Sequence, residues 1–227
     1  MQYVMSDIHG CRDSFYRLLS QIGFGGGDAL YILGDVLDRG PDGVRLLLEL
    51  ERLDGVTLLR GNHEHTVLML LRQAAHGTMQ RAMQAAWRLW LSDGGQRTWD
   101  AFCALSAQEQ VRVLSYLDSL PLFAELTAAG RSFFLSHTGP SREKMRNLDN
   151  CHMRDLLFGE IEYEKRYFDD CIFVSGHTPT QLIDPAYAGR VWRGNGHIAI
   201  DCGAAYGGRL ACVCLETLEE YYCPGRA

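Results

Sequence analysis

Six side chains of metal-binding type lie at separate points of this sequence, each close behind a short run of apolar residues. In chain order they are Asp7, His9, Asp35, Asn62, His137 and His177. Carboxylate, amide and imidazole groups bind divalent metals, and six of them suffice for two ions. Two such ions roughly 3.5 to 4 Å apart can share a carboxylate and a bridging hydroxide, an arrangement suited to in-line displacement at phosphorus. We predict a dinuclear centre in which Asp35 is the shared carboxylate.

A second set of residues could act on a phosphate ester bound at such a centre. Hydrolysis of a phosphate monoester needs neutralisation of the phosphate charge, an activated water and a proton for the leaving alkoxide. We predict that Arg39 and Arg154 clamp the phosphoryl oxygens, because a guanidinium offers a planar fork of donors that an ammonium lacks. His63 is the predicted proton donor, and Asp38 is predicted to keep His63 cationic.

Three assignments are less tightly fixed by the sequence. Arg154 is placed by order and approximate spacing alone, and Asn62 is predicted to contact substrate as well as metal. Arg60 is equally compatible with a minor phosphate contact and with an ion pair to a nearby acid. A lone Asp or His behind a strand is more often a turn or cap residue, so the metal centre is favoured by the presence of all six ligands together.

The strands and helices that must position these residues alternate along the chain, which predicts a layered α/β fold. The apolar spacing predicts strands at residues 3–6, 29–33 and 56–59, followed by helices at 11–22, 42–53 and 66–72. Further strands are predicted at 122–126, 132–136, 171–175 and 197–200, with a helix near 152–158. The polar motifs stand at strand ends, where an open α/β sheet places its ligands.

Residues 73–121 interrupt this alternation. One helix carries Trp87 and Trp90, a break follows at residues 93–95, and Ser106 with Glu109 forms a capping box that opens a second helix. We predict one domain of residues 1–227 with a helical cap inserted at about 73–121, which covers one edge of the site and contributes substrate selectivity. The tryptophans and methionines of the cap are predicted to be core residues.

Composition excludes several classes of partner. With 227 residues, 47% of them hydrophobic, the chain can form one large domain. A net charge of −6 without a basic cluster argues against nucleic acid and anionic membrane surfaces. The apolar runs are too short to span a bilayer and the first ten residues lack a signal-peptide pattern, so we expect a cytoplasmic protein.

The eight cysteines include no C-x-x-C pair, which favours reduced and mostly buried thiols over disulfides or a zinc site. Cys212 and Cys214 would share one face of a strand as small core residues. Cys11 is predicted to open a helix whose dipole favours the thiolate, so oxidation sensitivity is a hypothesis for this residue.

The motifs together resemble a known signature. The sequence reads D-x-H-G at residues 7–10, G-D-x-x-D-R-G at 34–40 and G-N-H-E at 61–64, followed by His137 and by G-H-T-P at 176–179. This ordered set resembles the metallophosphoesterase signature of the PPP-type serine/threonine protein phosphatases and extends over nearly the whole chain. The small size and the D-G-G segment at 93–95 resemble the bacterial and phage branch, which includes the lambda phage protein phosphatase.

The resemblance implies two β-sheets flanked by helices and two divalent metal ions. One ion would be bound by Asp7, His9 and Asp35, and the other by Asp35, Asn62, His137 and His177. Manganese is favoured by the resemblance to bacterial relatives, although iron, zinc and nickel also suit these ligands. The matching family positions carry the roles predicted above for His63, Asp38 and Arg39.

The resemblance leaves three functions open. The favoured one is hydrolysis of a phosphorylated protein or peptide by a monomeric enzyme, and the alternative is hydrolysis of diadenosine tetraphosphate on the same scaffold. The dinucleotide hydrolases that resemble this chain typically lack an acid at the position of Asp38, so its presence favours the phosphatase. A non-catalytic binding module is the weakest hypothesis, because the ligands and the acid are all present.

Several other residues have weaker claims to the site. Tyr206 could line it, and Asp201 is predicted to have a buried hydrogen-bonding role. The histidines outside the motifs are predicted to be surface or satisfied polar groups, and they are His65, His76, His152 and His197.

Overall fold

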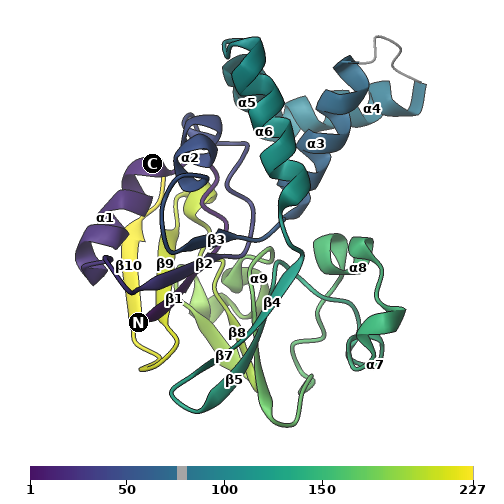
Figure 1. Cartoon of the computed structure of the whole chain (residues 1–227). Coiled ribbons are helices and arrows are strands. Elements are labelled where there is room, and N and C mark those ends of the chain that lie inside the picture. Colours follow the sequence, from purple (N-terminus) through teal and green to yellow (C-terminus); the bar gives the residue numbers. More distant parts are fainter. Residues whose placement is uncertain (76–80, 227) are drawn as a thin grey trace.

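Two five-stranded sheets form the body of the protein, as the computed structural model of residues 1–75 and 81–226 shows (Figure 1). The first sheet has the order β10-β9-β1-β2-β3. Its strands are β1 (Gln2–Met5), β2 (Ala29–Ile32), β3 (Val56–Leu58), β9 (Arg209–Cys214) and β10 (Glu220–Pro224). Strands β1, β2 and β3 are parallel, so their carboxyl ends meet at one edge. The three predicted strands before residue 60 are therefore confirmed.

The second sheet has the order β4-β5-β6-β8-β7. Its strands are β4 (Phe123–Ala128), β5 (Arg131–Ser136), β6 (Cys171–Ser175), β7 (Trp192–Gly194) and β8 (His197–Ala199). The predicted hairpin is confirmed, although its turn is tighter than expected and consists of residues 129–130 between β4 and β5. Strands β5, β6 and β8 are parallel, which places His137 and His177 just past two neighbouring strand ends.

Alternating side chains divide the apolar residues into layers. Val4 and Val213 of the first sheet face Leu135 and Val174 of the second in a core between the sheets. Met5 points to the opposite face, where helices cover the first sheet. A smaller cluster that includes Phe134 and Phe173 lies on the outer face of the second sheet. The structure is thus an α/β fold with two mixed sheets flanked by helices, as predicted.

Helices on the outer faces are mostly short. Helix α1 (Arg12–Ile22) lies against β10 and β9, and α2 (Gly43–Leu50) follows β2. Between strands of the second sheet, α7 (Arg142–Met145) and α8 (Met153–Phe158) connect β5 to β6, and α9 (Thr180–Ile183) follows β6. The predicted helix near 152–158 is confirmed. None of the helices in the two described ranges is long and apolar enough to cross a membrane.

A group of helices stands out from one end of the layered body (Figure 1). It consists of α3 (Asn62–Ala75), α4 (Arg81–Trp90), the π-helical turn Leu91–Gly95, α5 (Gln96–Cys103) and α6 (Ala107–Ser119). The capping box of Ser106 and Glu109 is confirmed. The division of the chain into one domain with a cap at about 73–121 stays a prediction.

One prediction about these helices was wrong, and one helix was missed. Helix α3 begins at Asn62, four residues before the predicted start, because the polar motif occupies its first turn. Helix α5 was not predicted, since it is short and directly follows two glycines. His76 lies outside the described residues, so its predicted surface position is untested.

The cysteines of this structure are free thiols. Cys212 and Cys214 are buried in the same cluster on the helix side of the first sheet, as predicted. The expectation of a thiolate at Cys11 was wrong, because burial raises the pKa of that thiol. Cys11 precedes α1 but lies 8% exposed between the carbonyl oxygens of His9 and Ala204.

Candidate metal centre

The loops that follow β1 and β2 lie side by side and hold the first predicted ligands. Asp7 N donates to Gly34 O, His9 N donates to Asp35 O and Gly10 N donates to Val36 O, at 3.2, 2.8 and 2.8 Å. These bonds extend the pairing of the two strands into their loops. The ligands are therefore held by backbone as well as by side chains.

Unusual backbone angles are concentrated in these loops. Nine non-glycine residues of the described chain have positive φ, and six of them are predicted site residues: Asp7, His9, Asp35, Asp38, Arg39 and His177. A positive φ costs a side chain-bearing residue of order 1–3 kcal/mol, and such residues collect at functional sites. The glycines of the motifs allow the loops to approach, since a Cβ on Gly34 would lie 2.5 Å from Gly61 Cα.

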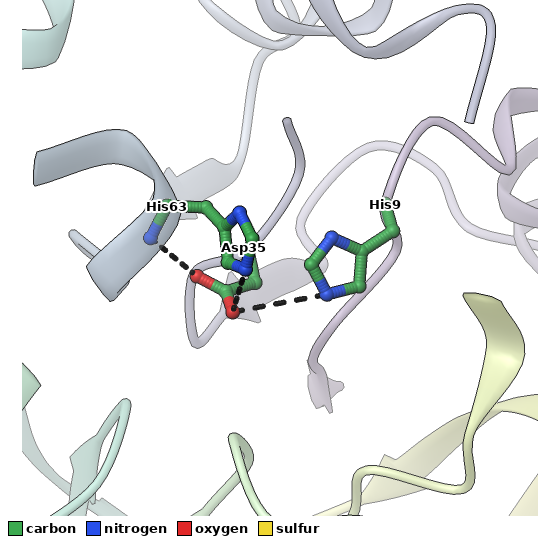
Figure 2. A group of neighbouring side chains, drawn as sticks. All are labelled: His9, Asp35 and His63. Atoms are coloured by element: carbon green, nitrogen blue, oxygen red, sulfur yellow. Dashed lines mark hydrogen bonds and ion pairs between the residues drawn. The ribbon is translucent and has the colours of Figure 1, made fainter. Parts of the chain in front are cut away.

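Asp35 lies between His9 and His63, as Figure 2 shows, and is also close to His137, which is not drawn there. Its Oδ2 is 3.8 Å from His9 Nε2, 3.9 Å from His63 Nε2 and 3.5 Å from His137 Nε2. Its Oδ1 accepts from the backbone N–H of His63 at 3.1 Å, at the beginning of α3. Burial opposes ionisation of Asp35, but the surrounding histidines lower its pKa overall. Asp35 thus has the position expected for a shared carboxylate.

The second group of predicted ligands comes from both sheets. His137 Nε2 lies 2.7 Å from Asn62 Oδ1 and 3.1 Å from His177 Nδ1, and His177 Nδ1 lies 3.0 Å from the same Asn62 oxygen. His137 is fully buried. Asp35, His137 and His177 together offer ligand atoms within 4.8 Å of one another. The structure therefore brings a carboxylate, an amide and two imidazoles together, as the sequence predicted.

The hydrogen bonds of the imidazoles test whether this site fits a metal. His9 Nδ1 lies 2.8 Å from Leu37 O and His137 Nδ1 lies 2.8 Å from Leu33 O, so each Nδ1 carries the proton and donates it. Each Nε2 then has a lone pair directed into the site. For His137 that lone pair faces the Asn62 carbonyl oxygen. Converging lone pairs of N and O groups are the donor set of divalent transition metals, and the residues fit such ions.

Asp7 lies beside this group and its negative charge is costly there. Its Oδ2 accepts from His177 N at 2.9 Å and from the Ser6 hydroxyl. Burial and the charge of Asp35 raise the pKa of Asp7. Buried carboxylates of like charge are stabilised by bound cations. Asp201 lies nearby with a pKa raised well above its ordinary value by burial and by Asp7, and it accepts from Gly203 N at 2.9 Å, which agrees with its predicted buried role.

Asp38 and His63 form a buried pair. His63 Nδ1 lies 2.6 Å from Asp38 Oδ2, and Asp38 is fully buried, so its predicted contact with His63 is present. Burial lowers the pKa of His63, but Asp35 and the bond to Asp38 raise it to about 9 overall. Two divalent cations beside Asp35 would lower this pKa by charge repulsion. The second nitrogen, Nε2, remains directed toward Asp35.

Two residues of the helical group hold Asp38, and sequence reasoning missed both. Trp90 Nε1 donates to Asp38 Oδ2 at 2.9 Å, and Thr98 Oγ1 donates to Asp38 Oδ1 at 2.6 Å. Thr98 Oγ1 also accepts from Asp38 N at 3.0 Å. Trp90 is a buried core residue, as predicted, and in addition a hydrogen-bond donor. Asp38 is 52 positions from Trp90 and 60 positions from Thr98 in the sequence, so no local pattern links them.

Glu64 is a further residue without an assigned role in the sequence prediction. It is fully buried and accepts four backbone N–H groups, from Asp35, Val36, Leu37 and Gly61. The only signal in the sequence was its place in the G-N-H-E motif. Glu64 holds the loop after β2 against the beginning of α3.

The three predicted arginines differ in whether they contact other predicted site residues. Arg39 contacts His9 Nε2 with Nη1 and lies over the Tyr206 ring at 5.0 Å, so it is at the site, and the exposed Tyr206 is at its edge. Arg60 donates to Asp118 O at 2.6 Å and contacts Met153 Sδ at 3.8 Å. Arg154 has an exposed side chain on α8, and among the described residues no contact joins it to the ligands.

The remaining histidines lie outside the ligand groups. His152 is exposed, as predicted, and His65 is half-buried beside Phe158. His197 is buried between the rings of Tyr163 and Phe173, with Nε2 2.9 Å from Ser175 Oγ. Burial lowers the pKa of His197 to about 3. It is therefore a neutral core residue rather than a ligand.

A set of buried carboxylate, amide and imidazole ligands beside a paired acid defines a metal-dependent hydrolytic site. The model of the calcineurin-like phosphoesterase family matches residues 3–207, and the chain belongs to this family. The family uses a dinuclear divalent metal centre, and the chain has candidate ligand groups for it around Asp35.

Curated relatives carry two kinds of name. The symmetrical bis(5'-nucleosyl)-tetraphosphatase of Acidovorax sp. (strain JS42) is 47% identical over 78 residues, which is 34% of this chain and 26% of that protein. The asymmetrical bis(5'-nucleosyl)-tetraphosphatase PrpE of Geobacillus sp. (strain WCH70) is 24% identical and covers 97% of this chain and 93% of its own length. Serine/threonine-protein phosphatase 1 of Salmonella typhimurium is 29% identical over 92% of this chain and 88% of its own.

The matches to the symmetrical tetraphosphatases cover less than half of those proteins, which limits what their names imply for this chain. This chain spans 26%, 34% and 43% of the lengths of three relatives named as symmetrical tetraphosphatases. A solved structure, of a protein provisionally described as a diadenosine tetraphosphatase, has a TM-score of 0.71 at 21% identity and covers 99% of this chain and 93% of its own. At that identity the likeness shows the fold alone.

Proposed function

We propose that this protein hydrolyses phosphate monoesters whose leaving groups are basic alkoxides, with phosphoserine and phosphothreonine in proteins or peptides as the substrate class. The observation that carries the proposal is the 2.6 Å contact between His63 and the fully buried Asp38. An alkoxide leaves well only when it receives a proton, and a buried Asp–His pair is a means of supplying one. Two of the three relatives above match over about nine tenths of both chains. The one with the higher identity, 29% against 24%, is named as a serine/threonine phosphatase.

The geometry suggests how the residues divide the work. When bound by the ligands around Asp35, divalent ions supply Lewis acidity and an activated water, and we propose manganese for both sites. Arg39 binds phosphoryl oxygens and balances their charge. His63 donates its Nε2 proton to the leaving oxygen, because its Nδ1 is committed to Asp38. Asp38 orients His63 and favours its cationic form. Asn62 contacts a metal and a phosphoryl oxygen in this proposal.

The roles of two arginines are narrower. Arg60 is 9% exposed and uses Nη2 on Asp118 O, so only its remaining donors could reach a substrate. Arg154 is in the turn of α8 whose Met153 contacts the Arg60 guanidinium. We propose that Arg154 moves toward the phosphate when substrate binds. A monomeric state and a cytoplasmic location stay predictions from the sequence.

Hydrolysis of dinucleoside tetraphosphates is the second candidate, and the names of the relatives favour it more strongly than the first. Tetraphosphatases of both the symmetrical and the asymmetrical kind are among them, and one of the latter spans 97% of this chain. That reaction expels a nucleotide whose phosphate is already a weak base, so it needs little from a protonated histidine. The buried Asp38–His63 pair would then have no catalytic use.

A substrate comparison with four proteins tests the proposal. The parent, Asp38→Asn, His63→Asn and the exposed control His152→Asn would be stripped of metal, reloaded with manganese and measured for kcat/KM. The substrates are a phosphoserine peptide, phenyl phosphate and diadenosine tetraphosphate. We expect the parent to prefer the peptide, and the first two variants to lose more activity on it than on the aryl ester.

Single-turnover measurements would establish that chemistry limits the rate in each comparison. A parent enzyme that prefers diadenosine tetraphosphate by kcat/KM would replace this proposal with the second candidate. Equal losses on the peptide and on phenyl phosphate would show that His63 is not the proton donor.

A further inference from the structure

The turn between α4 and α5 brings an exposed carboxylate to the candidate active site. Asp93 lies in the π-helical turn Leu91–Gly95, where its φ of −90° and ψ of 22° depart from helical values. Its Oδ2 is 3.2 Å from Arg39 Nη2 and 3.9 Å from His63 Nε2. The Asp93 side chain is 56% exposed, whereas that of His63 is 7% exposed. A negative charge is thus present where solvent reaches the proposed proton donor.

Contacts on both sides fix the position of this turn. Gly94 O accepts from Arg39 N at 3.1 Å, and a Cβ on Gly94 would lie 2.8 Å from Arg39 Cα. Trp90 before the turn and Thr98 after it both donate to Asp38. The turn is therefore attached to the loop after β2 at three points. These contacts fix the backbone of Asp93 beside the loop that carries Arg39.

We propose that Asp93 sets leaving-group selectivity by repelling substrates that carry negative charge next to the scissile phosphate. The inference rests on the proposed function, in which His63 Nε2 protonates the leaving oxygen. Atoms bonded to that oxygen must pass close to Asp93, because its carboxylate is 3.9 Å from Nε2. A serine or threonine side chain in a neutral or basic peptide brings no negative charge to this place. An acidic peptide or a polyphosphate leaving group does.

The size of the effect follows from Coulomb's law. For a substrate charge about 7 Å from Asp93 and an effective dielectric constant of about 40, each unit of negative charge should lower kcat/KM roughly sevenfold. A positive charge at the same place should raise it by a similar factor. Because Asp93 is exposed, salt should weaken both effects, and most of the discrimination should be lost at about 1 M ionic strength.

The test compares Asp93→Asn with the parent and with Asp100→Asn, which removes one exposed carboxylate from α5 in the same helical group. The probes are three phosphoserine peptides of equal length that have aspartate, glutamine or arginine on both sides of the phosphoserine. The measurement is the ratio of kcat/KM between peptides, at low and high salt. A loss of stability would act on all three peptides alike, so the ratio isolates the charge effect of Asp93 together with that of its ion pair with Arg39.

In the parent we expect the arginine peptide to be preferred and the aspartate peptide to be disfavoured. Asp93→Asn should reduce each ratio at least fivefold, and Asp100→Asn should leave the ratios unchanged. An Asp93→Asn enzyme that is slower on all three peptides by one common factor would overturn the inference and leave the proposed function standing. A parent that turns over diadenosine tetraphosphate in preference to every peptide would overturn both.

Discussion

Replacement of Glu64 by glutamine tests whether the loop after β2 is held by one buried carboxylate. Oε2 accepts from Asp35 N at 2.7 Å and Gly61 N at 3.0 Å, and Oε1 accepts from Val36 N at 2.9 Å and Leu37 N at 3.1 Å. A glutamine keeps one of these oxygens and replaces the other with an NH₂ group, which cannot accept. Two of the four backbone donors would therefore lose their partner in a buried place.

The cost can be worked out from this count. Each buried donor left without an acceptor costs about 1–3 kcal/mol, so two of them cost about 2–6 kcal/mol. Burial and, second, the negative charge of Asp35 raise the pKa of Glu64, so part of the cost of its charge is repulsion from Asp35. A neutral side chain relieves that repulsion, and we expect a loss in the lower half of this range. Such a loss is a large part of the stability of a domain.

Urea unfolding of metal-free protein, followed by circular dichroism, would measure this loss without interference from metal release. The exposed Glu143 provides a matched control, and Glu143→Gln should change the unfolding free energy by less than about 0.5 kcal/mol. Equal unfolding free energies for Glu64→Gln and Glu143→Gln would refute the reasoning, because the four hydrogen bonds would then not be holding the loop.

Other predictions concern separate parts of the molecule. Burial lowers the pKa of His197 to about 3 in the folded state, so the free energy of unfolding should fall as the pH drops below 6.5, by about 3 kcal/mol at pH 4. His197→Phe should remove most of that loss when urea unfolding at pH 7 is compared with urea unfolding at pH 4. Asp35→Asn should lower the content of both metals, and retention of two ions per chain by elemental analysis would contradict a shared ligand. Trp90→Phe should lower kcat more on alkyl than on aryl phosphates with KM little changed, since its indole N–H donates to Asp38. Equal effects on both substrates would contradict a positioning role. Arg154→Ala should weaken inhibition by inorganic phosphate severalfold at unchanged metal content, and parent-like inhibition would exclude it from the phosphate site.

The three parallel strands of the first sheet and the candidate ligands behind them could be predicted because their signals are local. Apolar runs gave β1, β2 and β3, and parallel strands bring their carboxyl ends to one edge. Polar residues directly after such strands therefore had to lie near one another. Asp35 and His9 needed no long-range information to be paired.

The start of α3 illustrates where local reasoning fails. Asn62, His63 and Glu64 have no apolar periodicity, so they read as loop, yet they form the first turn of a helix. Their polar side chains are satisfied by partners distant in sequence, as His63 is by Asp38. When functional polar residues occupy the first turn, the apolar periodicity that predicts a helix is absent there.

Contacts across the molecule were beyond the sequence for a different reason. Trp90 looks like an ordinary member of an amphipathic helix and Thr98 lies in a helix that was not predicted, and the kinked turn between α4 and α5 directs both toward Asp38. The position of Arg154 likewise depends on how α8 packs against α3, which no spacing rule determines.

The strained loops explain why the motif contains more residues than the chemistry uses. Six site residues have positive φ, and at of order 1–3 kcal/mol each this arrangement could not persist without strong restraint. Glu64 accepts four hydrogen bonds from the two loops that converge on Asp35, and Gly34 approaches Gly61 so closely that there is no room for a Cβ at Gly34. The candidate ligands are therefore held close together by the contacts of the protein itself. In this view the glycines and the final glutamate of the motifs serve the metal centre indirectly, by keeping an unfavourable backbone in place.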